Sequence, residues 1–192
     1  MMRRLLNLLM QGRSPRRELF VHEDDWGQIE LLPASCAAWC AQEMGRLDAF
    51  AAEHEAPGGS GWTDMYVRQP SPKPLAALAI PFDDAVAAVS ARLPPFDAVV
   101  SGTFSDAHPV PRVRAFGPAH HVGVVLVPDA ELRIVEMISL VLGGTQEQCA
   151  GVIDALGAVP SPQPLLLTDW LGGSTVLIAA EQTSGDRGEL LA

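Results

Sequence analysis

The sequence predicts an α+β or α/β fold: a single domain with a mixed β-sheet, an N-terminal hairpin, a C-terminal hairpin and three to four packed helices. Apolar runs of strand length, bounded by glycine and proline, alternate with segments in which apolar residues recur every three to four positions. Hydrophobic residues make up 48% of the 192 residues and aromatic residues 6%. This composition is typical of a globular chain with many turns, and the length allows one domain to fold without disulfides or metals.

The globular domain is predicted to span residues 18–180. A basic N-terminal tail, residues 1–17, precedes it, and a disordered C-terminal tail, residues 181–192, follows it. The opening MMRRLLNLLM has too short an apolar run for a signal sequence, and no window is long and apolar enough to span a membrane. Three cysteines are an odd number in a chain without an export signal, so we expect reduced thiols and a cytoplasmic protein.

The first elements are expected to be a hairpin and a helix. Residues 18–32 read as two strands around a turn at Asp25, Trp26 and Gly27, because glycine suits the left-handed position of a three-residue loop. In this register the polar face of the hairpin carries four side chains: His22, Asp24, Gln28 and Glu30. Residues 33–55 are predicted to be helical, since apolar residues recur there at spacings of three and four: Cys36, Cys40, Met44, Leu47 and Ala51.

The middle of the chain is predicted to hold a strand, a helix and a strand, at residues 75–80, 82–93 and 96–101. Residues 102–120 lack a period and are rich in proline, arginine and serine, which indicates a long surface loop. A buried strand is expected at residues 121–127.

The segment after Pro128 carries a polar residue at every third position, which favours a helix with a narrow polar stripe and leaves a hairpin as the alternative. Thr145 and Gln148 are spaced as a capping box for another helix, which Gly157 closes. Two nearly apolar strands, residues 164–170 and 174–179, then form a C-terminal hairpin, expected in the middle of a covered sheet.

Charge indicates which class of partner the protein binds. The formal net charge is −10. Five of the thirteen basic residues precede Glu18, which leaves eight basic against 23 acidic residues in the rest of the chain, a formal charge of −15. Such a surface repels phosphate backbones, so nucleic acid is excluded as a ligand, whereas a basic protein would be attracted.

The sequence contains no G-x-S-x-G, phosphate loop, H-E-x-x-H, dinucleotide fingerprint or paired C-x-x-C motif, and no cofactor is expected. His22, Asp24 and Glu30 are suited to a divalent metal or to proton transfer, which is the alternative of a metal-assisted hydrolase. A surface charge pair explains them more simply. Cys36 and Cys40 are one helical turn apart and are interpreted as core packing, because a zinc site needs a second pair of ligands.

Three histidines are further acid–base candidates. His108 lies in the predicted loop, and His120 and His121 enter a strand from it, a place where binding groups are often displayed. Adjacent residues of a strand point to opposite faces, so His120 and His121 serve one site only if the strand begins after them.

Trp26 stands at a predicted hairpin tip flanked by Asp24 and Asp25. An exposed tryptophan is typical of a surface on which partners dock, and the alternative is that its ring folds back onto the domain. The acidic charge, the absence of catalytic motifs and this tip favour a non-enzymatic protein-binding domain.

In size, charge and fold class the chain resembles the immunity proteins encoded beside bacterial polymorphic toxins. The resemblance implies a toxin as protein partner, basic if the toxin is a nuclease, which the chain would occlude. We expect its recognition by Glu23, Asp24, Asp25 and Trp26. A third possibility is a chaperone or adaptor protein in which residues 1–17 are the working part.

Overall fold

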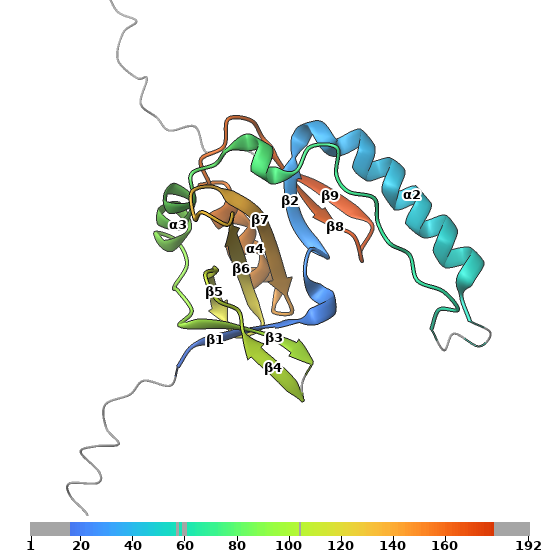
Figure 1. The fold of residues 1–192 in the computed structure, drawn as a ribbon, viewed down its shortest axis with the longest axis horizontal. Helices are drawn as coiled ribbons and strands as arrows, with labels where there is room; N and C mark the ends of the chain where they lie inside the picture. The colour runs from blue at the N-terminus through green and yellow to red at the C-terminus, as the bar shows by residue number, and fades with distance from the viewer. Residues whose placement is uncertain (1–15, 57, 59–60, 104, 179–192) are drawn as a thin grey trace, which may run out of the picture.

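A six-stranded antiparallel sheet forms the centre of the computed structural model, which describes residues 16–56, 58, 61–103 and 105–178 (Figure 1). Its strands follow one another in space as β5 (Arg114–Ala119), β6 (Val122–Pro128), β7 (Val135–Leu142), β2 (Ile29–Pro33), β8 (Leu165–Asp169) and β9 (Ser174–Ile178). The central strands are buried on both faces, which fits their near-continuous runs of valine, leucine and isoleucine.

A smaller mixed sheet covers part of one face of this large sheet. It contains β1 (Glu18–His22), β3 (Ala98–Thr103) and β4 (Asp106–Pro109), with β1 parallel to β3 and β4 antiparallel to it. Buried residues of the small sheet, Leu19 and Val21 among them, pack against Ala115 and Val125 of the large sheet.

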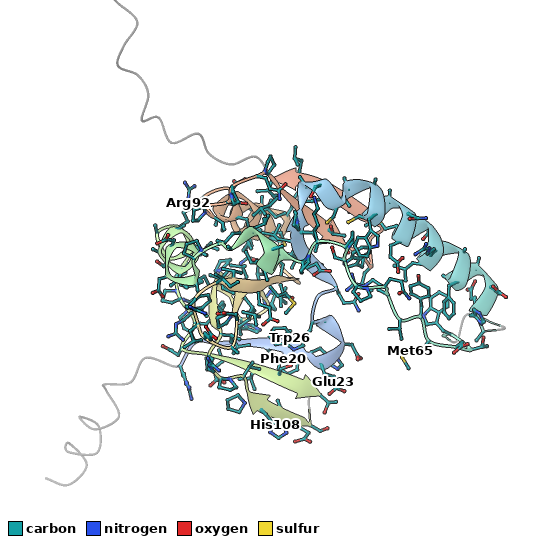
Figure 2. All side chains as sticks on the ribbon, turned by 45° about the horizontal axis from the view of Figure 1, so that its top comes forward. Phe20, Glu23, Trp26, Met65, Arg92 and His108 are labelled. Carbon is teal, nitrogen blue, oxygen red and sulfur yellow. The ribbon has the colours of Figure 1, made fainter. Side chains whose placement is uncertain are left out.

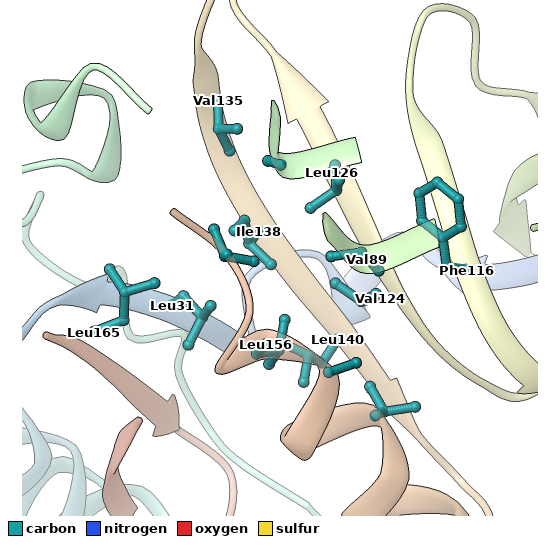
Figure 3. Packing of buried hydrophobic residues seen from close by; sticks show 14 of the residues in the cluster. Leu31, Val89, Phe116, Val124, Leu126, Val135, Ile138, Leu140, Leu156 and Leu165 are labelled. Carbon is teal, nitrogen blue, oxygen red and sulfur yellow. The ribbon is translucent and has the colours of Figure 1, made fainter. Parts of the chain in front are cut away.

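Among the described residues there are three α-helices: α2 (Ala37–His54), α3 (Phe82–Ser90) and α4 (Gln146–Leu156). Three short 3-10 turns accompany them: η1 (Glu23–Asp25), η2 (Ala34–Cys36) and η3 (Leu75–Leu78). Helices α3 and α4 and turn η3 supply residues to the main core, which Figure 3 shows around Leu31, Ile138 and Leu156. Helix α2 packs on the opposite face of the sheet, over Leu32, Leu166 and Trp170.

Several predictions from the sequence are confirmed. The fold is a single α+β domain with a C-terminal hairpin, β8–β9, and helices lie where the apolar spacing placed them, at α2, α3 and α4. The capping box is present: Thr145 Oγ1 accepts a hydrogen bond from Gln148 N, and Gln148 Oε1 accepts one from Thr145 N.

The predicted N-terminal hairpin is wrong. The two strands exist, but β1 pairs in parallel with β3, whereas β2 lies between β7 and β8 in the large sheet. Both Leu31 and Leu32 are buried, so β2 needs cover on both faces, which a surface hairpin does not give it. The prediction of one mixed sheet is corrected in the same way, because the strands divide into two sheets.

Three other elements differ from the prediction. The segment after Pro128 is the strand β7, and Asp129, which resembled a helix start, instead accepts hydrogen bonds from Arg133 N and Ile134 N in the β6–β7 turn. The strand expected at residues 75–80 is the turn η3. The loop expected at residues 102–120 contains β4 and β5.

The C-terminal hairpin also lies elsewhere than expected. It was placed in the middle of a covered sheet, yet β9 is the outermost strand, and its first four residues are exposed.

Residues 1–15 and 179–192 lie outside the described residues, and so do the parts of the two predicted tails that they contain. Arg17, which was assigned to the basic tail, belongs to the fold. Its guanidinium donates hydrogen bonds to the carbonyl oxygens of Pro95 and Gly117 and stacks over Phe96. Within the described ranges no helix is long and apolar enough to cross a membrane.

Candidate functional site

The acidic residues after β1 form the turn η1, which leads from the small sheet to the large one. Glu23 and Asp24 are exposed and Asp25 is partly buried. Trp26, labelled beside them in Figure 2, is partly buried, and its Nε1 donates a hydrogen bond of 2.7 Å to Ser101 Oγ. The ring thus packs back against the small sheet, as in the alternative that the sequence left open, and the turn presents mainly carboxylates.

The three residues of the metal-site alternative are in different surroundings. His22 Nδ1 lies 3.5 Å from Asp24 Oδ2. Glu30 is in the other sheet, where its Oε1 accepts hydrogen bonds from Arg68 at 3.0 Å and from Trp170 Nε1 at 2.8 Å. In the part of the chain that the structure describes, no group of three or more histidine, cysteine, aspartate or glutamate side chains is placed to hold a metal ion.

Two of the three histidine candidates meet. Because β6 begins only at Val122, His120 and His121 lie in the β5–β6 turn, with His121 Nδ1 3.2 Å from His120 Nε2. His108 is on β4, where its Nε2 lies 3.1 Å from Asp106 Oδ1. All three are exposed, and none lies among the residues that line the pocket described below.

The cysteines are free thiols and lie where core packing was predicted. Cys36 of η2 and Cys40 of α2 are buried against β2 and β8, and Cys149 packs against the main core. Burial raises the pKa of Cys40 above its ordinary value, which keeps this thiol protonated and unreactive.

The most distinctive surface lies around α2 and the segment that follows it. We call residues 62–70 the strap, and α2 together with the strap the arm. Figure 1 shows the arm extending away from both sheets, with the strap alongside the helix. Only Cys40 and Glu43 of α2 are buried, so most of this helix lies on the surface of the molecule.

Glu43 fixes the strap to the helix. Its side chain has no solvent exposure, and its carboxylate accepts hydrogen bonds from Tyr66 Oη at 2.8 Å, from Gln69 N at 3.0 Å and from Arg46 at 2.9 Å. Burial alone would raise the pKa of Glu43, but these three donors outweigh it and hold the pKa below its ordinary value. The carboxylate therefore stays charged and keeps the strap in one position. Phe50 adds to this by packing against the Tyr66 ring.

The strap displays large apolar side chains to solvent. Trp62 is 63% exposed, Met65 79% and Val67 75%. Figure 2 shows Met65 pointing away from the arm. Isolated exposed apolar residues are common, whereas here three lie within six positions of one segment, and a concentration of this kind is typical of interaction sites.

A pocket of about 390 Å³ opens where the strap returns to the large sheet. Residues of β2, β7, α2 and the segment 68–75 line it, and they include Glu30, Trp39, Arg68, Glu136 and Met137. Arg68 organises this region: it pairs with Glu30, donates a hydrogen bond to Gly27 O and stacks 4.2 Å above the Trp170 ring. The pocket wall thus carries the carboxylates of Glu30 and Glu136 beside apolar surface.

The sequence did not reveal the arm as a site. No local pattern singles out Trp62, Met65 or Val67 as interacting residues, and the apolar spacing of α2 gives no role to Glu43. The one available signal was a glutamate within the apolar stripe of a predicted helix, between Cys40 and Leu47, because a carboxylate in such a position needs hydrogen-bond donors from elsewhere.

Comparison with known proteins gave no match: no protein-family model, no curated protein and no solved structure matches this chain.

Proposed function

We propose that this chain is a non-enzymatic protein-binding domain that recognises its partner through the arm. The observation that carries the proposal is the exposure of Trp62, Met65 and Val67 on a strap that a buried glutamate holds in place. Covering such side chains contributes roughly 1.5–3 kcal/mol each. A backbone that is already fixed loses little conformational entropy on binding, which favours affinity.

The charges of the arm suggest a basic partner. Four exposed carboxylates lie on the arm or directly after its helix: Asp48, Glu53, Glu55 and Asp64. Two of the basic residues of the arm are already in ion pairs, Arg46 with Glu43 and Arg68 with Glu30. Exposed apolar side chains and carboxylates on the same part of the fold attract a partner that carries lysine or arginine beside apolar residues.

We further propose that the partner is a toxin and that the chain is a bacterial immunity protein that occludes it. Size, acidic charge and α+β class support this proposal. The turn with Glu23, Asp24 and Asp25 would add to the attraction of a basic toxin, and Trp26 would hold that turn against the small sheet through Ser101.

The test begins with the genomic neighbourhood, where we expect an adjacent gene for a large secreted toxin. Co-expression of the chain with the toxin domain should then rescue cell growth. The double variant Trp62→Ala/Met65→Ala should lose rescue and weaken binding about 100-fold or more, since truncated aromatic anchors cost 2 kcal/mol or more in interfaces.

Leu132→Ala is the matched control, because Leu132 is an exposed leucine of the β6–β7 turn, outside the arm. It should bind as the wild type does. Full rescue by the Trp62/Met65 variant, with a melting temperature equal to that of the wild type, would rule out the arm as the binding surface.

A further inference from the structure

The pocket at the base of the arm is built from parts of the chain that are far apart in sequence. Residues of β2, β7, the start of α2 and the segment 68–75 line it, and its volume is about 390 Å³. This volume is near the lower end of the roughly 300–1,000 Å³ range of pockets that hold small ligands. The pocket therefore has room for one side chain of a partner, and not for a helix or a strand.

Much of the pocket wall is apolar. Trp39 of α2 contributes an aromatic ring, and Leu32, Leu75 and Met137 add aliphatic and thioether surface. The Trp39 ring is only partly buried and makes an edge contact with the Trp170 ring, with 5.6 Å between the ring centroids. An indole that is supported by a neighbour and still accessible can contact both the methylene groups and the charged head of a cationic side chain.

The pocket carries one more carboxylate than it has cations. Two glutamates and one arginine are among the lining residues, which gives a formal charge of −1. Glu30 is already paired with Arg68, whereas Glu136 is exposed and forms no ion pair with any of the described residues. Lys73 belongs to the same segment as Arg68 but does not line the pocket. The pocket therefore favours a cation and repels phosphates and carboxylates.

Arg68 shows how this region holds a guanidinium group. It donates hydrogen bonds of 3.0 Å to Glu30 Oε1 and to Gly27 O, and it lies 4.2 Å above the Trp170 ring. These contacts keep Arg68 engaged within the fold. Trp39 and Glu136 offer the same two features, an aromatic ring and a carboxylate, to a guanidinium that comes from outside.

We propose that the pocket binds one arginine side chain of the basic partner protein, with the guanidinium at Glu136 and the methylene groups along Trp39 and Met137. This inference rests on the proposed function, because the partner supplies the arginine. The strap connects the two surfaces, since residues 68–70 line the pocket and the exposed apolar side chains precede them. Arginine is favoured over lysine because its planar head stacks on aromatic rings and is more weakly hydrated.

Titration of the full chain with N-acetyl-arginine methylamide tests the pocket without any toxin. The indole N–H resonance of Trp39, identified by its loss in Trp39→Phe, should shift and reach saturation. N-acetyl-citrulline methylamide has nearly the same shape but no charge, and it should bind about threefold more weakly or worse. N-acetyl-lysine methylamide should also bind more weakly than the arginine compound.

Glu136→Gln removes the unpaired carboxylate and keeps the size of the side chain. It should weaken binding of the arginine compound about threefold or more at low salt, and weaken binding of the toxin domain by a similar factor. Because Glu136 is exposed, the melting temperature should stay close to that of the wild type. Glu147→Gln is the matched control, since Glu147 is an exposed glutamate of α4 outside the pocket, and it should bind both as the wild type does.

Four results would overturn the arginine site. They are a Trp39 resonance that does not shift, binding of the citrulline or lysine compound as tight as that of the arginine compound, unchanged binding of the arginine compound by Glu136→Gln, and unchanged binding of the toxin domain by that variant. The amide titration contains no toxin, so its outcome does not depend on the role of the strap. Arginine binding that requires Glu136, together with full rescue by Trp62→Ala/Met65→Ala, would retain the pocket and reject the exposed strap.

Discussion

Glu43 shows how one residue joins an exposed surface to the interior. A charged side chain without solvent exposure is costly unless donors surround it, and here the donors are the Arg46 side chain, the Tyr66 hydroxyl and the Gln69 backbone N–H. The cost of burying this carboxylate is compensated by contacts to a strap whose other side chains mostly face solvent. A strap held in one position is what the proposed binding of a partner requires.

Replacing Glu43 should therefore destabilise the protein. We expect Glu43→Ala to lower the free energy of unfolding by about 2–4 kcal/mol, because three donors lose their acceptor. Glu43→Gln, which keeps an acceptor oxygen, should lose roughly half as much. Urea denaturation followed by circular dichroism measures both. Equal and negligible losses would mean that the strap does not depend on this carboxylate.

The lowered pKa of Glu43 predicts that the stability of the fold depends on pH. The pKa of Glu43 is lower in the folded than in the unfolded chain, so the unfolded state binds more protons at intermediate pH and stability rises with pH. The contribution is fully present above the unfolded pKa of about 4.3 and is lost as pH falls through the folded pKa. Between about pH 5 and pH 3, Glu43→Gln should lose less stability than the wild type. Parallel curves of stability against pH for the wild type and Glu43→Gln would contradict a lowered pKa of Glu43.

Residues whose partners are close in sequence could be predicted, and residues with distant partners could not. The Thr145–Gln148 pair and the packing of the cysteines follow from local spacing. By contrast, Trp26 bonds to Ser101, 75 positions away, and no local pattern selects that partner. The arm was missed for the same reason, because its key contact joins Glu43 to Gln69 across a loop.

At the scale of elements, helix α4 begins with a complete capping box. Thr145→Ala removes one side of it and should cost about 1 kcal/mol of stability. Thr175→Ala, at an exposed position of β9, is the control and should change stability by less than about 0.5 kcal/mol. Thermal or urea unfolding of the two variants side by side measures the difference, and equal effects would leave the box without an energetic role.

Strand pairing is where prediction from the sequence failed. The alternation of apolar and polar residues predicted the positions of β1 and β2. It does not say which strand lies beside each of them. Neighbouring segments were paired because short connections are common, whereas β1 in fact bonds to β3, about 80 residues later. Strand β7 was misjudged because an apolar run with polar residues at every third position also fits a helix, and only its pairing with β6 identifies it as a strand.

At the scale of the whole molecule, negative charge is expected to speed the association of a basic partner. The reversal Asp24→Lys/Asp25→Lys should slow association with a basic toxin domain about tenfold at low salt and flatten the salt dependence of the rate. Stopped-flow mixing at several salt concentrations measures this. Glu147→Lys/Asp154→Lys on α4 is a control of equal charge change outside both η1 and the arm. An unchanged association rate for Asp24→Lys/Asp25→Lys would show that η1 takes no part in recognition.

The exposure of Trp62 has a practical consequence for experiments. Of the four tryptophans, Trp26, Trp39 and Trp170 are buried or partly buried in packed clusters, and only Trp62 is mostly in water. An indole that leaves water emits at shorter wavelength. The chain thus contains its own unlabelled optical probe at the surface where we expect a partner to dock, and Trp62→Phe identifies how much of any spectral change arises there.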